Sequence, residues 1–250
     1  MSETQKEVAS ICAKCPNKVC YPRIGVNDPM PDLEEAPTFC PMRRMPELLE
    51  KVKSEYEKEN IREFARLASK QEAECYEITP DGLRTRIPRL EEVIQFAKKC
   101  NYKTIGVGFC IGLKKEMKMV TEILETKGLK VVSVNCKVGA IPKEFINLKD
   151  EEKILPGTHE SMCNPIGQAE ILNNEPVDFA IMLGLCVGHD TLFLKYLEVP
   201  CTVLAVKDRV LGHNPLAACY LSEGPYYSRM RMPQENQDTG EKVDIRDENR

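Results

Sequence analysis

The stretch KTIGVGFCIGLKKEMKMVTEILETKGLKVVSVN, residues Lys103–Asn135, decides the fold. Its two ends, Lys103–Phe109 and Leu129–Asn135, are short apolar runs rich in β-formers, and we expect both to be strands. The charged segment between them carries apolar residues at helical spacing and ends at Gly128, which is typical of the position just past a helix. A strand, a helix and a second strand in this order predict a βαβ unit with parallel strands.

The same alternation continues downstream. Strands are expected at Asp178–Gly184 and Cys201–Lys207, and the first of these is continuously apolar, as in strands buried on both faces. Asn164 and Pro165 are typical of the cap and the first residue of a helix. Further helices are expected at Arg89–Cys100, His189–Val199 and within Leu211–Tyr220. We therefore predict an α/β protein with a small open parallel sheet of about four strands, flavodoxin- or Rossmann-like, in the order 2-1-3-4, with flanking helices.

Four regions are expected along the chain. Residues 1–45 are rich in cysteine and proline and are predicted to be a metal-binding segment, because they contain too few periodic apolar residues for a core of their own. Residues 46–88 are predicted to be a helical linker region that packs on the core, with a helix over 46–77 followed by a loop. Residues 89–228 form the α/β domain, and the polar residues 229–250 are predicted to be a disordered tail.

Composition narrows the class of protein. The net charge of −4 comes from mixed acids and bases without a basic stripe, which argues against nucleic acid and a membrane surface as partners. The start of the chain lacks an apolar signal segment, and the longest apolar run, Phe179–Val187, is too short to span a bilayer. We therefore expect a cytoplasmic protein that acts on a small-molecule substrate or meets a redox partner, with its oligomeric state left open. Because cytosolic thiols stay reduced, the 12 cysteines favour metal binding or catalysis.

The first cysteine group is N-terminal. Cys12, Cys15, Cys20 and Cys40 have the spacing C-x2-C-x4-C-x19-C-P, which provides four thiolates. A cysteine followed by proline, as at Cys40, is common at the last ligand of bacterial iron–sulfur sites, so a [4Fe–4S] cluster is favoured. Zinc is the alternative, although structural zinc sites usually pair two closely spaced cysteine knuckles.

The second cysteine group lies at the predicted strand ends. Cys110, Cys136 and Cys186 follow the first three strands, and Cys163 lies just ahead of a helix. Ligands of open parallel sheets bind beyond the carboxyl ends of the strands, where the strand order reverses. We expect these four cysteines to form a shared metal or reactive-thiol site, with Cys110 facing Cys186 across the reversal point.

The same loops supply glycines and histidines. Four glycines are predicted to let the backbone approach a bound cofactor: Gly108, Gly112, Gly184 and Gly188. His189 and His213 are candidate proton-transfer groups, with Asp190 expected to orient the ring of His189. His159 is a further acid/base candidate.

Several segments resemble one protein family. These are RLEEVIQFAKK (Arg89–Lys99), IGVGFCIGL, ESMCNPIGQAEILN, GLCVGHDTLF and VKDRVLGHNPLAA. They resemble the domain-of-unknown-function family 1847 of anaerobic bacteria and archaea, which carries the label "metal-binding protein". The resemblance covers roughly residues 89–220, and CAKCPNKVC is similar to the opening cysteines of that family. It implies metal binding through cysteines and no particular reaction.

Three functions therefore remain open. The first is a metalloprotein with one or two iron–sulfur clusters, at the N-terminal and strand-end cysteines, that has a redox role or activates a small substrate such as a sulfur species. The second is a zinc-binding structural, sensor or metal-delivery module without catalysis. The third is a thiol oxidoreductase that contains no metal.

Overall fold

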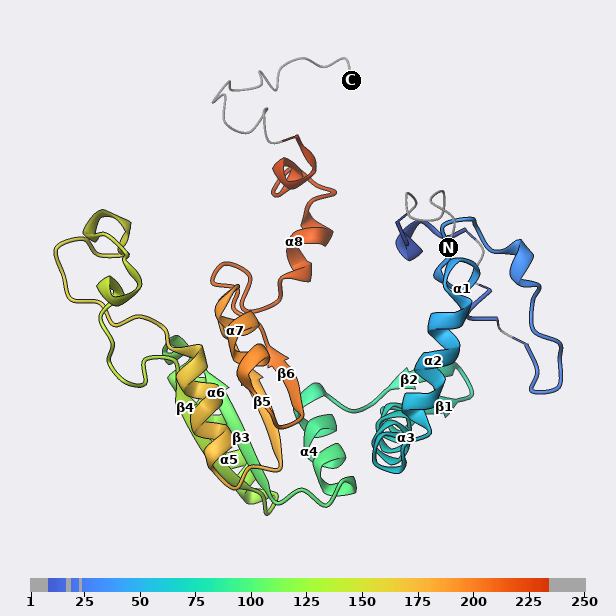
Figure 1. Ribbon diagram of the computed structural model, residues 1–250, viewed down its shortest axis with the longest axis horizontal. Coiled ribbons are helices and arrows are strands. Elements are labelled where there is room, and N and C mark those ends of the chain that lie inside the picture. Colours follow the sequence, from blue (N-terminus) through green and yellow to red (C-terminus); the bar gives the residue numbers. More distant parts are fainter. Residues whose placement is uncertain (1–8, 17–18, 23, 234–250) are drawn as a thin grey trace. The chain divides into compact units, whose positions relative to one another are not determined.

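The computed structural model describes residues 9–16, 19–22 and 24–233. The chain separates into two compact units, Met1–Glu74 and Cys75–Arg250, and each is described by itself (Figure 1). The division falls inside the region 46–88 that was expected to be a helical linker.

The first unit consists of short helices and loops. Its α-helices are α1 (Pro41–Arg44), α2 (Pro46–Tyr56) and α3 (Glu59–Glu74), and its described 3-10 helices are η2 (Cys12–Lys14) and η3 (Leu33–Glu35). The prediction of a single helix over 46–77 is wrong. The segment forms two helices, α2 and α3, which are separated after Tyr56, and the second of them ends at Glu74. The apolar stripe is interrupted there, since polar residues occupy the positions three and four after Tyr56 and the next apolar residue is Ile61.

A small apolar cluster forms in the cysteine-rich part of the first unit. Val19, Ala36 and Cys40 are buried in it, and Leu33 and Met42 pack against them. The cysteine-rich segment therefore buries one of its four cysteines among its own side chains.

The second unit opens with a hairpin where the sequence predicted the end of a helix and a loop. Strands β1 (Tyr76–Thr79) and β2 (Gly82–Thr85) pair antiparallel. The two-residue turn between them is followed by Gly82 at φ +117°, a backbone conformation that favours glycine. Pro80, Asp81 and Gly82 therefore serve as a hairpin turn.

Four parallel strands form the main sheet. They are β3 (Thr104–Phe109), β4 (Lys130–Asn135), β5 (Phe179–Leu183) and β6 (Cys201–Ala205), and they lie in the order β4-β3-β5-β6. Counted along the chain, these four strands have the order 2-1-3-4. The predicted α/β class is confirmed, and the sequence order reverses between β3 and β5.

Helices cover both faces of this sheet. α6 (Pro165–Asn174) and α7 (His189–Tyr196) pack together on one face (Figure 1). α4 (Arg89–Lys99) and α5 (Lys114–Thr126) belong to the opposite layer, where the ring of Phe96 meets that of Phe179 at 5.9 Å between centroids. The predicted helix signals hold, because Asn164 caps α6 and Gly128 follows α5 at φ +83°.

The α6–α7 layer approaches the sheet closely because glycine replaces a side chain on β3. A Cβ atom at Gly108 would lie 2.5 Å from the ring of Phe193 in α7, which no real contact reaches. Gly108 therefore has a packing role, whereas the sequence predicted that it approaches a bound group.

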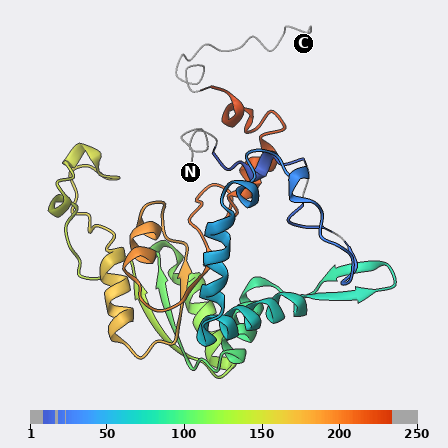
Figure 2. The same ribbon diagram turned by 45° about the vertical axis from the view of Figure 1, so that its right-hand side comes forward.

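A long connection leaves the sheet between β4 and α6 (Figure 2). It contains η5 (Lys143–Ile146) and η6 (Asp150–Glu152). The buried ammonium group of Lys153 stabilises this connection through ion pairs with Glu144 at 2.5 Å and Asp150 at 2.9 Å.

The second unit ends with α8 (Leu216–Leu221) and η7 (Ser228–Arg231). The tail predicted to be disordered from residue 229 therefore begins inside a 3-10 helix, and its residues from 234 on lie outside the described part. Within the described residues, no helix combines the length and the apolar character needed to cross a membrane.

Candidate functional site: a row of three thiols

The parallel register places two cysteines side by side at the carboxyl edge of the sheet. Phe109 of β3 pairs with Asn135 of β4, so the next residues, Cys110 and Cys136, continue the same ladder. The backbone N–H of Cys136 donates to the Phe109 carbonyl at 2.9 Å, which holds this register beyond the strands. Because side chains alternate between the faces, both cysteines fall on the face covered by α6 and α7. They are buried in one core cluster, with exposed fractions of 8% and 2%.

The start of α6 brings in a third cysteine. Asn164 accepts a hydrogen bond from Gly167 N–H at 2.9 Å and so caps this helix, while its own N–H donates to the Cys136 carbonyl at 2.7 Å. The preceding residue, Cys163, thereby lies against Cys136, and their sulfur atoms are 3.8 Å apart. We call Cys110, Cys136 and Cys163 the thiol row, with Cys136 at its centre.

Contacts among the sulfurs set their acidities. A hydrogen bond with Cys136 lowers the pKa of Cys163 to about 5, and the charges of Lys137 and His189 act in the same direction. The pKa of Cys110 is lowered for the same first reason, with help from the Gly112 backbone N–H and from Lys207. The two neighbours and burial raise the pKa of Cys136. Cys136 therefore keeps its proton. Because a thiol carries a single proton, Cys136 donates a hydrogen bond either to Cys110 or to Cys163 at any one time.

A buried glutamine fixes the strand ends beneath the row. The Nε2 atom of Gln168 in α6 donates to the carbonyls of Phe109 at 3.0 Å and Val134 at 2.7 Å. Its Oε1 atom is buried and has no hydrogen-bond partner among the described residues. Gln168 was not predicted from the sequence, although its spacing from Pro165, Ala169 and Leu172 marks it as part of the buried face of α6.

Cationic side chains lie beside the thiols, and these were not predicted from the sequence either. Lys207, just after β6, interacts with Cys110. Lys137, next to Cys136, interacts with Cys163, and its Nζ donates to the Ser161 carbonyl at 2.6 Å. Each of these lysines is the second residue after the end of a strand, a signal that the sequence does contain.

The fourth predicted member of the strand-end group, Cys186, contacts an arginine. Arg209 Nη2 lies 3.0 Å from its sulfur atom. The sequence predicted Cys186 opposite Cys110, whereas the thiol that forms a hydrogen bond with Cys110 is that of Cys136. The backbone stays paired with the β6 side through Leu185, whose carbonyl accepts from Lys207 N–H at 3.1 Å, and Cys186 follows this last hydrogen-bonded residue.

The histidines have separate environments. His189 is the first residue of α7, acts electrostatically on Cys163, and has a buried Nδ1 without a partner among the described residues. Asp190 was expected to orient this ring, but its Oδ1 accepts from the N–H of Thr191 at 2.7 Å. His213 adopts φ +67°, and its Nδ1 accepts from Asp208 N–H at 3.2 Å.

The other predicted residues fall outside the row. His159 is exposed on the long connection and interacts electrostatically with Glu144. Gly184 packs so closely that a Cβ atom there would lie 1.9 Å from Leu113, and Gly188 caps α7 at φ +83°. A Cβ atom at Gly112 would lie in ordinary contact with Lys207 Nζ and Cys110 Sγ, so Gly112 is close to both.

The four N-terminal cysteines of the first unit, Cys12, Cys15, Cys20 and Cys40, all line one cavity of about 230 Å³. Its other walls are mainly apolar, including Val19 and Phe39. The donor set and the space fit a metal ion or a cluster. In the described part of the chain, however, no three or more His, Cys, Asp or Glu side chains are already gathered as a metal-holding group.

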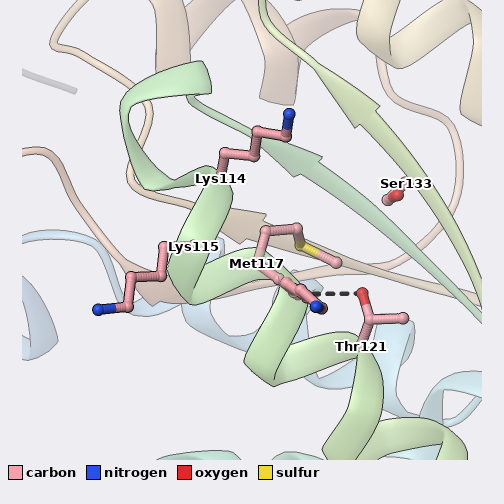
Figure 3. A pocket seen from close by; sticks show the side chains of 6 residues that line it. Lys114, Lys115, Met117, Thr121 and Ser133 are labelled. Carbon is pink, nitrogen blue, oxygen red and sulfur yellow. Dashed lines mark hydrogen bonds between the residues drawn. The ribbon is translucent and has the colours of Figure 1, made fainter.

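The structure also contains a larger, open cavity of about 530 Å³ between α5 and β4 (Figure 3). Lys114, Lys115 and Met117 line it from α5, and Ser133 lines it from β4. Because Ser133 alternates with Val134 on the strand, this cavity lies on the α5 face, opposite the thiol row. It contains none of the predicted site residues.

Fold and site define a cysteine-rich α/β protein with thiols at the carboxyl edge of a parallel sheet. The chain belongs to the family described as "Protein of unknown function (DUF1847)", which matches residues 40–204 and confirms the resemblance. An uncharacterized protein of Methanocaldococcus jannaschii is 41% identical over 209 residues, which cover 84% of this chain and 93% of that protein. No solved structure matches. The matched range includes the thiol row and begins at Cys40, after the first three N-terminal cysteines.

Proposed function

We propose that the α/β unit is a thiol-dependent redox protein that reduces a disulfide substrate with Cys163 and Cys136. The observation that carries the proposal is the 3.8 Å contact between their sulfur atoms, with Cys136 as the thiol that keeps its proton. A thiolate is the nucleophile in thiol–disulfide exchange, and a neighbouring thiol resolves the mixed disulfide.

Cys163 is the better candidate for the attacking thiolate. It is half-buried, whereas Cys110 and Cys136 are buried. It directly precedes the cap of the ten-residue helix α6, whose N-terminal dipole favours a negative charge. Lys137 and His189 add positive potential there.

The proposed half-reaction, in which the two thiols reduce one substrate disulfide, balances in atoms and electrons. The Cys163 thiolate attacks one sulfur of a substrate disulfide, forms a mixed disulfide and releases the other half as a thiolate. Cys136 then passes its proton to the released thiolate and attacks the Cys163 sulfur, which releases the second half as a thiolate. Two electrons pass from the cysteines to the substrate, and the sulfur atoms close from 3.8 Å to a disulfide bond of about 2.05 Å.

The test uses the anaerobically purified full chain. We expect one equivalent of diamide to produce a Cys136–Cys163 disulfide in peptide mass maps, in the wild-type protein and in Cys219→Ser, which changes an exposed cysteine of α8. Elemental analysis runs in parallel. Stoichiometric iron, sulfide or zinc that is lost from a Cys136→Ser/Cys163→Ser variant would contradict the proposal and support a metal centre at the strand ends.

A second function is proposed for the first unit, on the observation that its four N-terminal cysteines line one cavity. These cysteines would hold an iron–sulfur cluster or a zinc ion. A cluster would supply one-electron transfer, and zinc would supply structural stability. The cysteine residues would provide the thiolates, and mainly apolar side chains would line the rest of the cavity.

Elemental analysis and EPR of the anaerobically prepared full chain distinguish these cofactors. We expect bound iron with sulfide, or zinc, that is absent from a Cys12→Ala/Cys15→Ala variant and retained in Cys219→Ser. Metal content that is equal in both variants, or zero in the wild-type protein, would contradict this assignment.

A further inference from the structure

The thiols at the sheet edge have positively charged neighbours that lack carboxylate partners. Lys207 interacts with Cys110, Lys137 with Cys163, and Arg209 with Cys186. Among the residues that the structure describes, none of these three cations forms an ion pair with a carboxylate. Their positive charge is therefore directed at the sulfur atoms and at whatever reacts with them.

The nearest acid in sequence forms no ion pair with these cations in the described part of the chain. Asp208 lies between Lys207 and Arg209, yet its carboxylate accepts from the backbone N–H groups of Val210 at 2.9 Å and Leu211 at 2.8 Å. These hydrogen bonds to backbone N–H groups hold the Asp208 carboxylate within its own turn.

Gly112 leaves room between one cation and one thiol. A Cβ atom built there would lie 3.5 Å from Lys207 Nζ and 3.8 Å from Cys110 Sγ, both ordinary contact distances. The glycine itself is exposed, so this small space is open to solvent. Alanine fits without a clash and would occupy the space, which makes Gly112→Ala a direct probe of it.

The charge balance changes during the proposed reaction. When the Cys163 thiolate becomes a mixed disulfide, its negative charge leaves with the released thiolate. Lys137 then lacks its anionic partner, and a substrate that carries its own anionic group restores the balance.

We propose that the disulfide substrate is a small anionic one, selected by Lys137, Lys207 and Arg209 as specificity-determining residues. This inference rests on the proposed thiol–disulfide function. A single unit charge at about 7 Å in water changes a rate by about threefold at low salt, because the Coulomb energy there is close to RT. Two of these cations acting on a dianion therefore predict a preference of tenfold or more.

The experiment compares three disulfides of different charge on the full chain: dianionic 5,5′-dithiobis(2-nitrobenzoate), neutral 4,4′-dithiodipyridine and dicationic cystamine. The rate of Cys163 modification is read by quenched peptide mass spectrometry and divided by the rate of free cysteine with the same disulfide. We expect a normalised preference for the dianion over the dication of at least about tenfold at low ionic strength, reduced by 0.5 M salt.

Substitutions identify which residues cause the preference for the dianionic disulfide. Lys137→Gln and Lys207→Gln should each lower the normalised preference for the dianion about threefold or more, and the double variant should lower it about tenfold. Gly112→Ala should also lower this preference without unfolding the protein. Lys130→Gln is the matched control, because Lys130 is exposed at the opposite, amino end of β4. Ratios between disulfides cancel any change in the thiolate fraction of Cys163.

The outcomes separate the two proposals. Absence of reaction at Cys163 with all three disulfides would overturn the thiol–disulfide function. If Cys163 reacts with the three disulfides in the same rate ratios as free cysteine does, the anionic-substrate inference alone would be overturned. A preference that persists in the double lysine variant, or that falls equally in Lys130→Gln, would also overturn it.

Discussion

Removal of the Cys136 thiol tests the reasoning about the thiol row most quantitatively. A hydrogen bond with Cys136 is the largest cause of the lowered pKa of Cys163. A hydrogen bond to a charged group contributes about 1.5–3 kcal/mol, and one pKa unit corresponds to 1.36 kcal/mol. We therefore expect Cys136→Ala to raise the pKa of Cys163 from about 5 by about one to two units.

The assay is the pH profile of Cys163 alkylation by iodoacetamide, read by peptide mass spectrometry between about pH 4 and 10. At about pH 6 the thiolate fraction, and hence the rate, should fall about two- to tenfold in Cys136→Ala, while the rates converge above about pH 9. Cys136→Ser keeps a hydroxyl donor and should lie between the two, and Cys219→Ser should match the wild-type protein.

Two results would refute this reasoning. One is a wild-type midpoint near the value of a free cysteine, about 8.5. The other is a Cys136→Ala profile that superimposes on the wild-type profile, which would mean that the contact does not control the acidity of Cys163.

The remaining predictions concern stability. Gly108→Ala should lower the free energy of unfolding by about 1–3 kcal/mol or more through its clash with Phe193, whereas Gly112→Ala should leave it nearly unchanged; urea denaturation measures both. Gln168→Leu should cost about 1–3 kcal/mol, because two strand-end carbonyls lose their buried donor, and unchanged stability would contradict this role. Burial raises the pKa of Cys201 to about 12, so its thiol stabilises the fold fully below about pH 9 and less as the pH rises towards 12. The free energy of unfolding, measured by urea titration at about pH 7 and 10.5, should therefore fall less with pH in Cys201→Val than in the wild-type protein.

Much of the α/β unit follows from local signals in the sequence. The buried run of β5, the cap and proline at the start of α6 and the glycine after α5 each act over a few residues. The chirality of the crossovers then restricts how such strands are ordered. The split between α2 and α3 and the β1–β2 hairpin were missed, because charged residues that suit a helix also suit a solvent-exposed break or a short strand.

The sequence predicted that the three thiols of the row share one sheet edge with Cys186, and it did not predict which of them are in contact. Cys110, Cys136 and Cys163 were all expected at one sheet edge, yet the closest partnerships depend on register and on the cap of α6. A parallel register follows from long-range pairing that a single sequence does not display. The lysines were missed because a cation near a thiol is recognised only once the strand ends are placed together.

The most direct test of the thiol redox account follows the fate of the mixed disulfide on Cys163. The full chain is mixed with one equivalent of a small disulfide under anaerobic conditions and mapped by peptide mass spectrometry. We expect the wild-type protein to contain a Cys136–Cys163 disulfide without an adduct, and Cys136→Ser to retain half of the small disulfide on Cys163. A stable adduct on Cys163 in the wild-type protein, or modification elsewhere while Cys163 stays free, would contradict the account.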